Sequence, residues 1–316
     1  MTLPQIWHGL VWPLITLTVS ISAGLFAANL IESLHWTRAV AKVAAPLFRL
    51  SRLKDVSGAS FSMAFFSGAA ANTMLAEAYE QGKLSRREII LSNLFNSLPT
   101  YFLHLPTLFF VAAPFIGRAA VVYVSLTVLA AFLRTIAIVL VGRAILPASS
   151  EGCAVCLLTD TRKGFREVLA AVWGRFCKRL PRIVYVTAPI YALFFVLKQQ
   201  GLFDWLEGLF ARKSLLLGLL PPEAMGIVAF HVAAESAAGF AAAGALIDTG
   251  ALGLRQIVLA LLLGNILSSP MRAVRHQFPY YAGIFKPGLA AELIVWSQTW
   301  RALSLLVVAA GYALLG

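Results

Sequence analysis

The chain has 316 residues, of which 59% are hydrophobic and only 13% are charged, and its formal net charge is +12. A soluble domain carries about 25% charged residues, so this composition excludes an ordinary soluble protein. Several apolar runs approach the roughly 20 residues that a helix needs to cross a hydrocarbon core, and we see no series of short alternating segments as in a membrane β-barrel. We therefore predict an all-α integral membrane protein that crosses the bilayer several times.

The first half opens with an apolar span over about residues 9–32, followed by the amphipathic stretch 36–53, which suits a helix in the membrane interface. Residues 65–83 (FFSGAAANTMLAEAYEQGK) are mostly small, with a polar centre. Such a segment favours a re-entrant helical hairpin, because non-helical backbone at membrane depth must be buried in protein. A long apolar segment is then broken at NSLP (96–99), where proline removes a backbone donor, and a final span is predicted over about residues 118–145.

A more polar segment, residues 147–181, separates a first repeat (1–146) from a second (182–316). We interpret it as a cytoplasmic loop that continues into an amphipathic linker. It contains one C-x-x-C pair, Cys153 and Cys156. Without a second pair or a nearby histidine, this spacing is weak evidence for a zinc or redox site, and we interpret the segment as a loop that carries plain thiols.

The second half repeats the order of the first. A span over about residues 183–200 precedes an amphipathic stretch at 203–220. A second small-residue segment, FHVAAESAAGFAAAGALIDTG (230–250), again favours a re-entrant hairpin. A broken helix over about residues 254–286 contains NILSSP, and a final span is predicted over about 290–315.

An offset of 168 positions brings the two halves into register. Matches among alanines and leucines arise by chance in a chain so rich in both residues. An ordered run of matches that includes charged residues and glycines is not expected by chance. The run pairs Ala69 with Ala237, Ala70 with Ala238, Glu80 with Asp248, Gly82 with Gly250, Leu84 with Leu252 and Arg87 with Arg255. This pattern indicates an internal repeat.

Each half crosses the membrane three times if its hairpin enters and leaves on one side, so the second half is inverted. Residues 37–54, 83–87 and 143–182 hold sixteen Lys and Arg, whereas the segments predicted on the opposite side hold five. Positive charge is enriched on the cytoplasmic side. We therefore predict a multi-pass protein of a bacterial or archaeal cytoplasmic (inner) membrane, with both termini outside. Inverted repeats with paired broken helices are typical of secondary transporters, whose site lies near the midplane.

This order of elements resembles the nucleoside-recognition (Gate) domain family, whose core is similar to that of concentrative nucleoside transporters, bacterial ferrous-iron permeases and spore maturation proteins. The resemblance covers nearly the whole chain, mainly as element order and a few short motifs. The match to the iron permeases is poorer, because this chain has no G domain and no cysteine in either broken helix.

The resemblance implies a substrate site between the two hairpin tips and the two broken helices. It assigns the contacts to a ribose to Glu235 in VAAESAAG and to Asn265 and Ser268 in GNILSSP, with Ser269 beside them.

The tip of the first hairpin departs from the family pattern, because the Gln-Thr-Glu motif that reads the base is absent. Asn72 and Thr73 in GAAANTML stand in its place. By the same resemblance, a cation site between the first hairpin and the first broken helix draws on Ser67, Asn96 and Ser97.

Three charged positions stand out without the resemblance. Glu235 is the one carboxylate in the small-residue core of either hairpin, and an ionisable group at membrane depth is a functional candidate because its insertion costs about 2.5–3.5 kcal/mol. Arg134 and Arg301 lie in the middle of their spans and match across the repeat within one residue. They either brace the fold, for example as partners of Glu235, or bind a carboxylate or phosphate with their planar fork.

Arg272, Arg275 and His276 follow the second break, and the sequence supports two interpretations. If the broken helix continues past Pro270, these side chains face a cavity and attract an anionic solute. If the span ends at Ser269, they form a cytoplasmic loop explained by the positive-inside rule.

We expect a secondary transporter of a small polar solute, nucleoside-like or anionic, driven by Na⁺ or H⁺ and without a bound cofactor. The alternative is a membrane-embedded assembly or signalling subunit that does not transport, as in the spore maturation proteins. No nucleophile–base pair or metal-ligand cluster is evident, so we do not expect an enzyme, and the positive charge fits orientation in the bilayer rather than nucleic-acid binding. The expected partners are lipid and a small substrate, and a homo-oligomer is compatible with the sequence.

Overall fold

The computed structural model describes residues 50–147 and 220–315, with isolated positions within 6–26 and 166–196. Over these residues the protein is helical and contains no strand. Most of the first span of each half, most of both amphipathic stretches and the Cys153–Cys156 pair lie outside the described residues.

The helical elements of the two described ranges follow in chain order. They are α4 (Asp55–Ala64), α5 (Gly68–Glu80), α6 (Arg86–Phe95), α7 (Ser97–Ile116), α8 (Arg118–Ile145), α11 (Ala224–Ile247), α12 (Leu254–Leu267), α13 (Ser269–Arg272), the π-helix η3 (Ala273–Gln277), α14 (Phe278–Ala282) and α15 (Pro287–Leu315).

Among the described residues, three helical stretches are long and apolar enough to cross a membrane: α6 with α7 (Arg86–Ile116), α8 and α15. α8 occupies the residues predicted for the last span of the first half, and α15 begins at Pro287, slightly before the predicted start of its span. The described part is thus compatible with a multi-pass membrane protein.

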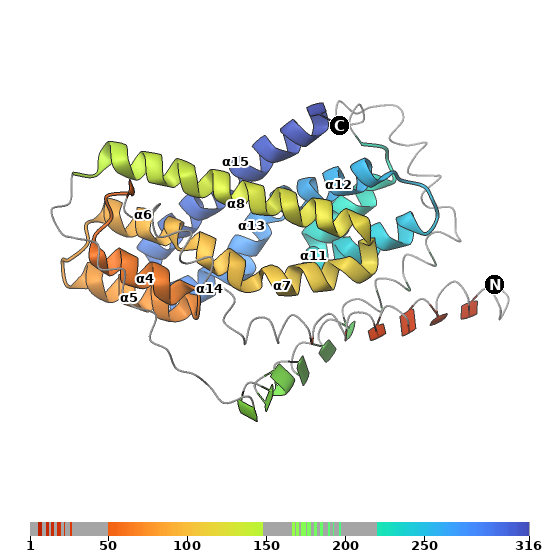
Figure 1. Cartoon of the computed structure of the whole chain (residues 1–316), viewed down its shortest axis with the longest axis horizontal. Helices are drawn as coiled ribbons and strands as arrows, with labels where there is room; N and C mark the ends of the chain where they lie inside the picture. Colours follow the sequence, from red (N-terminus) through yellow and green to blue (C-terminus); the bar gives the residue numbers. More distant parts are fainter. Residues whose placement is uncertain are drawn as a thin grey trace.

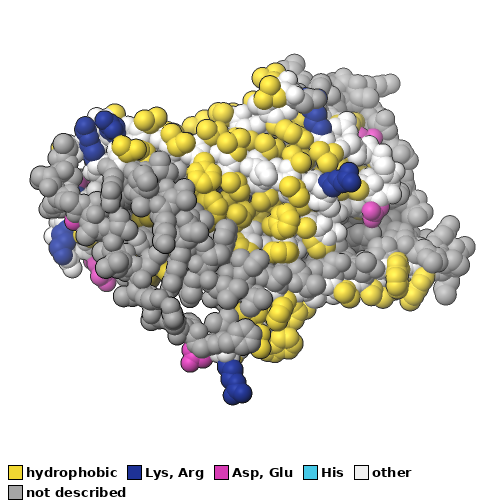
Figure 2. Space-filling view, in the orientation of Figure 1, with side chains coloured by type: hydrophobic (Ala, Val, Ile, Leu, Met, Phe, Trp, Pro, Cys, Tyr) yellow, Lys and Arg dark blue, Asp and Glu magenta, His cyan; other side chains and the backbone are white. Residues whose placement is uncertain are grey.

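The long helices connect two ends of the described structure (Figure 1). α4, α5 and α6 pack together at one end and α11 packs against α12 at the other, while α8 and α15 contact each other between them. On the face shown in Figure 2, hydrophobic side chains cover the middle of the described helices and Lys and Arg lie mainly toward the ends. Leu133 and Leu140 on α8 and Val307 on α15 are among the exposed apolar side chains. This distribution suits a bilayer, whose interior excludes charge.

α4 and α5 form a helical hairpin that turns at residues 65–67. Ser60 Oγ donates to the carbonyl of Ala71 across the hairpin at 3.0 Å, and Ser67 caps α5 by accepting from the Ala70 amide. The sequence placed the whole hairpin in residues 65–83, but this range holds only the turn and the second arm. The first arm starts at Asp55, where small residues at Ser57, Gly58 and Ser60 allow the close approach without giving a conspicuous Gly/Ala run.

α11 reverses direction between His231 and Gly239. A Cβ built on Gly239 would lie 2.7 Å from His231 Nδ1 and 2.9 Å from His231 Cβ. A straight α-helix rises about 1.5 Å per residue and separates residues eight apart by about 12 Å, so the chain must turn back between them. The turn falls within the predicted segment 230–250, and the first arm again begins earlier, at Ala224.

Each hairpin is followed by a glycine turn and a helix that starts in the same way. Gly82 and Gly250 have φ of 72° and 66°, which favours glycine at these turns. The Glu88 carboxylate then accepts from the Ser85 amide at 2.7 Å, and Gln256 Oε1 accepts from the Gly253 amide at 2.9 Å. These two N-terminal caps are separated by the 168 residues of the repeat.

The two predicted breaks are present but small. Helix α6 ends at Phe95 and α7 begins at Ser97, while α12 ends at Leu267 and α13 begins at Ser269. The linking residues, Asn96 and Ser268, keep right-handed helical angles (φ −62°, ψ −12° and φ −75°, ψ −9°). The breaks that the prolines predicted are therefore reduced to single residues with helical angles, since each proline sits in the first turn of the next helix, where its missing N–H removes few bonds.

Gly244 makes a close helix contact between the two halves. A Cβ at this position on α11 would lie 2.7 Å from the carbonyl oxygen of Phe115 on α7. We expect Gly244→Ala to lower the melting temperature of the purified protein, because the added methyl pushes against backbone and overpacking costs about 1–3 kcal/mol. Gly311→Ala on α15 is the matched control, since nothing lies within 4 Å of its Cβ, and equal melting temperatures for the two variants would contradict this close packing.

Candidate functional site

A cavity of about 480 Å³ lies between the first hairpin, both interrupted helices, α8 and α15. Eight of the residues that the sequence analysis singled out line this cavity, and they come from both halves of the chain. They are Asn72, Asn96, Ser97, Arg134, Asn265, Arg272, His276 and Arg301. The cavity therefore unites positions more than 200 residues apart.

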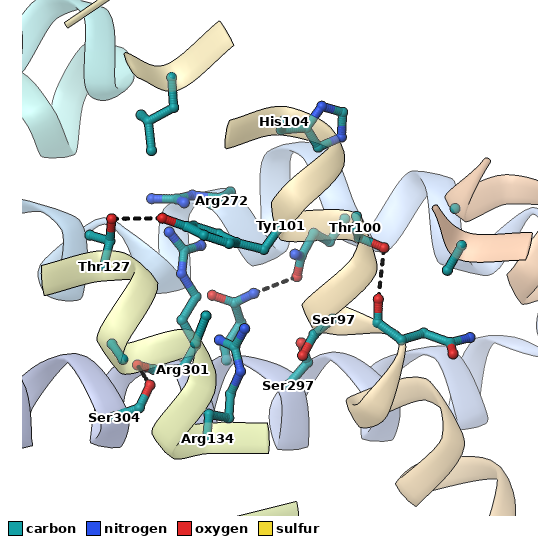
Figure 3. A pocket seen from close by; sticks show the side chains of 18 of the residues that line it. Ser97, Thr100, Tyr101, His104, Thr127, Arg134, Arg272, Ser297, Arg301 and Ser304 are labelled. Atoms are coloured by element: carbon teal, nitrogen blue, oxygen red, sulfur yellow. Dashed lines mark hydrogen bonds between the residues drawn. The ribbon is translucent and has the colours of Figure 1, made fainter. Parts of the chain in front are cut away.

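Three arginines from three elements point into one region of this cavity (Figure 3). Arg134 comes from the middle of α8, Arg301 from the middle of α15, and Arg272 from the end of α13. Arg134 is only 8% exposed and its Nε has no hydrogen-bond partner among the described residues. Placing one arginine at the centre of a bilayer costs about 2.5–3.5 kcal/mol, so arginines in the middle of helices long enough to span a membrane, such as Arg134 and Arg301, need a reason.

Asn265 holds two of these arginines in place. Arg301 Nη2 donates to Asn265 Oδ1 at 2.7 Å, and Arg272 Nη2 lies 3.5 Å from the same oxygen. The amide nitrogen of Asn265 donates to the hydroxyl of the fully buried Tyr123 at 2.8 Å, which fixes the direction of the side chain. Arg272 also donates to Ser268 Oγ at 2.7 Å. Asn265 and Ser268 thus position arginines in this structure.

Another part of the cavity lining consists of uncharged amides and phenols. Asn93 Nδ2 donates to Asn72 Oδ1 at 3.0 Å and lies 3.3 Å from the Tyr281 hydroxyl. Asn72 Nδ2 lies 3.4 Å from the Tyr280 hydroxyl. This network links α5 and α6 to α14, and it gives the cavity a neutral region with both donors and acceptors.

Further polar side chains line the cavity. Gln298 Nε2 donates to Gln277 Oε1 at 2.8 Å, and Gln298 Oε1 is buried with no partner among the described residues. The hydroxyls of Tyr101 and Thr127 lie 2.8 Å apart. The lining therefore offers unused hydrogen-bonding capacity to a bound molecule.

A second cavity of about 270 Å³ shares Ser236, Arg272 and His276 with the first. Ser268 lines it as well. Arg272 and His276 therefore face hollow space, as the first interpretation of this segment expects. The π-helix that carries His276 is a rare conformation often found at functional sites.

The structure does not bring every candidate to the cavity. Thr73 is exposed and bonds to the carbonyl of Ala69, because its neighbour Asn72 takes the inward face of α5 and consecutive helical residues point in different directions. Ser67 acts as the cap of α5, and Ser269 Oγ bonds to the carbonyl of Asn265. Arg275 lies in η3.

The backbone of Glu235 lies in α11, between the two arms of its hairpin, and its side chain is outside the described residues, as is that of Arg275. The next residue, Ser236, lines both cavities.

Of the proposed cation ligands, Asn96 and Ser97 line the main cavity and Ser67 does not. Asn96 Nδ2 donates to Ser60 Oγ at 2.7 Å, which leaves its buried Oδ1 without a partner among the described residues.

Sequence reasoning missed several lining residues that carried a readable signal. Tyr123 and Thr127 fall on the same face of α8 as the predicted Arg134, and Gln298 precedes the predicted Arg301 by three residues on α15. Polar residues at helical spacing inside an apolar span indicate a cavity-facing stripe. Asn93 likewise precedes Asn96 by three residues.

Three proteins of the archaeon Methanocaldococcus jannaschii are similar to this chain. The uncharacterized protein MJ0871 is 26% identical over 310 residues, which cover 95% of this chain and 93% of that protein. The uncharacterized protein MJ1556 is 27% identical over 289 residues, with 89% and 88% covered, and MJ0880 is 26% identical over 274 residues, with 84% and 86% covered. No family model matches the chain, and no solved structure matches it either. These relatives share the length of the chain, and the function is argued from the site.

Proposed function

We propose that this chain is a secondary membrane transporter of a small polar solute, coupled to Na⁺ or H⁺. The observation that carries the proposal is a cavity of about 480 Å³ between helices long enough to span a membrane, lined in part by charged and amide side chains from both halves. A membrane protein that needs only to hold its shape can pack this space with apolar side chains. Three arginines, four asparagines and a buried unpartnered glutamine oxygen instead fit a site for a hydrophilic molecule.

We propose further that the chain consists of two inverted repeats of the nucleoside-recognition type. Three features support this: the hairpins lie at opposite ends of the described structure, the two glycine turns share a positive φ, and the interruptions at Asn96 and Ser268 both follow a hairpin and its turn. In such an arrangement the hairpins enter from opposite faces of the cytoplasmic membrane, both termini lie outside, and the site forms between the repeats.

The second candidate function is a non-transporting membrane subunit of the spore maturation type. Such a protein has no need for a cavity with charged residues from both halves, and the lining therefore favours transport. A thermal-shift screen of the purified protein separates the two. Nucleosides, nucleobases and organic anions, each with and without Na⁺, are the test ligands, since a ligand of the folded state raises its apparent stability. Uptake of a hit into proteoliposomes would establish transport, while no stabilisation and no uptake across the whole panel would favour the subunit.

The inverted topology predicts that Lys83 and Arg118 lie on opposite sides of the membrane. Lys54 Nζ donates to the carbonyl of Lys83 at 2.9 Å, so these two lysines share the end formed by α4 to α6, and Arg118 begins α8 at the other end. With the three native cysteines replaced by serine, Lys83→Cys should react with an impermeant thiol reagent only from the cytoplasm and Arg118→Cys only from outside. Labelling of both from one side would refute the topology. Lys163 (cytoplasmic) and Lys213 (outside) extend the same test to segments beyond the described residues.

A further inference from the structure

We infer that the cavity binds the anionic group of an organic anion, such as a phosphate monoester or a carboxylate, between Arg134, Arg272 and Arg301, and the uncharged remainder of that molecule in the Asn72–Asn93 region. This inference rests on the proposed function only for its context, because binding can be measured without transport.

The charge of the lining is the first argument. Among the lining residues that the structure describes, three are arginines and none is acidic. Arg134 in particular is buried, and its Nε has no partner among the described residues. Burial of a guanidinium without a partner is unfavourable, and the cavity beside Arg134 therefore favours an anion over a neutral or cationic solute.

The geometry of the arginines is the second argument. Arg301 Nη2 and Arg272 Nη2 both approach Asn265 Oδ1, at 2.7 and 3.5 Å, so the two nitrogens lie no more than 6.2 Å apart. Two donors at this spacing can bond to different oxygens of one phosphate or carboxylate. Asn265 is a positioning residue here, and Tyr123 orients it through its amide nitrogen.

Unused donors are the third argument. A guanidinium carries five N–H donors in a planar fork that matches carboxylate and phosphate oxygens. Arg301 gives one of its donors to a described side chain, Asn265, and the buried Nε of Arg134 gives its hydrogen to none. Arg134 is more than nine-tenths buried and points into the cavity (Figure 3). This is the arrangement expected of a side chain whose donors bind an anion in the cavity.

The volume of the cavity and its neutral Asn72–Asn93 region indicate the chemistry of the uncharged part of the ligand. A volume of about 480 Å³ is several times the roughly 30 Å³ share of one water molecule, and it exceeds the need of a bare inorganic anion. The amides of Asn72 and Asn93 and the hydroxyls of Tyr280 and Tyr281 offer neutral hydrogen bonds in a region of the lining where their described hydrogen-bond partners are all uncharged. A molecule with an anionic head and hydroxyl or amide groups behind it satisfies both regions.

Matched ligand pairs test the inference. The purified wild-type protein is titrated with glycerol phosphate against glycerol, with uridine monophosphate against uridine, and with succinate and inorganic phosphate, at two ionic strengths. We expect at least one charged organic member to raise the melting temperature and its neutral partner, where it has one, to have at least tenfold weaker affinity. Neutral ligands that bind as tightly as their charged partners would overturn the inference, as would a response to no anion at all.

The variant Arg134→Gln identifies the site. Because Arg134 has no described partner, its loss should leave the ligand-free melting temperature unchanged or higher and weaken binding of the anion about tenfold to a hundredfold. Arg143→Gln is the control, since it removes the same charge from an exposed position on the same helix. Equal weakening by both variants would mean nonspecific attraction and would overturn the inference.

Arg301→Gln gives an independent test, because Asn265 keeps its bond to Tyr123 without it. Failure of both cavity variants to fold would assign these arginines to the fold itself and overturn the inference. The outcome for transport is separate. Anion binding without uptake into proteoliposomes would contradict the proposed transport function and support the anion site. Uptake of uridine without anion binding would support transport and contradict the anion site.

Discussion

Asn265→Asp is expected to abolish anion binding while leaving the protein as stable as the wild type, or more so. The new carboxylate has the shape of the amide and accepts from Arg301 and Arg272 at the positions where Asn265 Oδ1 lies now. Its second oxygen replaces Nδ2, and the Tyr123 hydroxyl can turn from acceptor to donor across the same 2.8 Å. In the variant, the carboxylate introduced at position 265 therefore occupies the arginine donors that would otherwise bind the anion.

The size of this effect follows from the charge. Two like charges about 5 Å apart repel by about 3 kcal/mol at an effective dielectric of about 20, which corresponds to an affinity more than a hundredfold weaker. The measurement is the melting temperature and the dissociation constant for the anion that stabilises the wild type best.

Asn93→Asp is the matched control for stability. Asn93 lines the same cavity, but its described partners are Asn72 and Tyr281 and include no arginine. A carboxylate there is buried without a cation, and we expect a clear fall in melting temperature. Equal losses of stability in Asn93→Asp and Asn265→Asp would show that the arginines do not create a positive site around Asn265.

Glu235→Gln is expected to weaken substrate binding about tenfold or more with little change in stability. The chain reverses close to Glu235, and its neighbour Ser236 lines the cavity, which places this residue at the tip of the second hairpin. If the carboxylate accepts hydrogen bonds from substrate hydroxyls, the amide keeps one acceptor and loses the charge. A hydrogen bond to a charged group contributes about 1.5–3 kcal/mol, which sets the size of the loss.

The structural alternative for Glu235 makes the opposite prediction. If it pairs with an arginine of the fold, the substitution leaves a buried charge unpaired at a cost of about 3–5 kcal/mol, and the melting temperature falls steeply. Glu223→Gln, at the start of the same element, is the control for the loss of one carboxylate. A large loss of stability with unchanged affinity would remove Glu235 from the binding site.

Local signals in the sequence determined the class of this protein and the bounds of several elements. The apolar run over residues 118–145 predicted α8 to the residue, because a glycine with φ of 49° at position 117 precedes it and the hydropathy of a span depends only on its own residues. The turns at Gly82 and Gly250 also carry a local signal, because the tolerance of glycine for positive φ is a property of that one residue.

The tertiary structure decided which of the polar candidates belong together. Thr73 and Asn72 are equal candidates in the sequence, and the packing of α5 turns one outward and the other into the cavity. Hydropathy marks Arg134, Arg272 and Arg301 as unusual but cannot say whether each meets a carboxylate, a carbonyl or a hollow. Their convergence depends on how α8, α13 and α15 pack, and the packing of helices in a membrane is set by shape and close contact, which no single segment encodes.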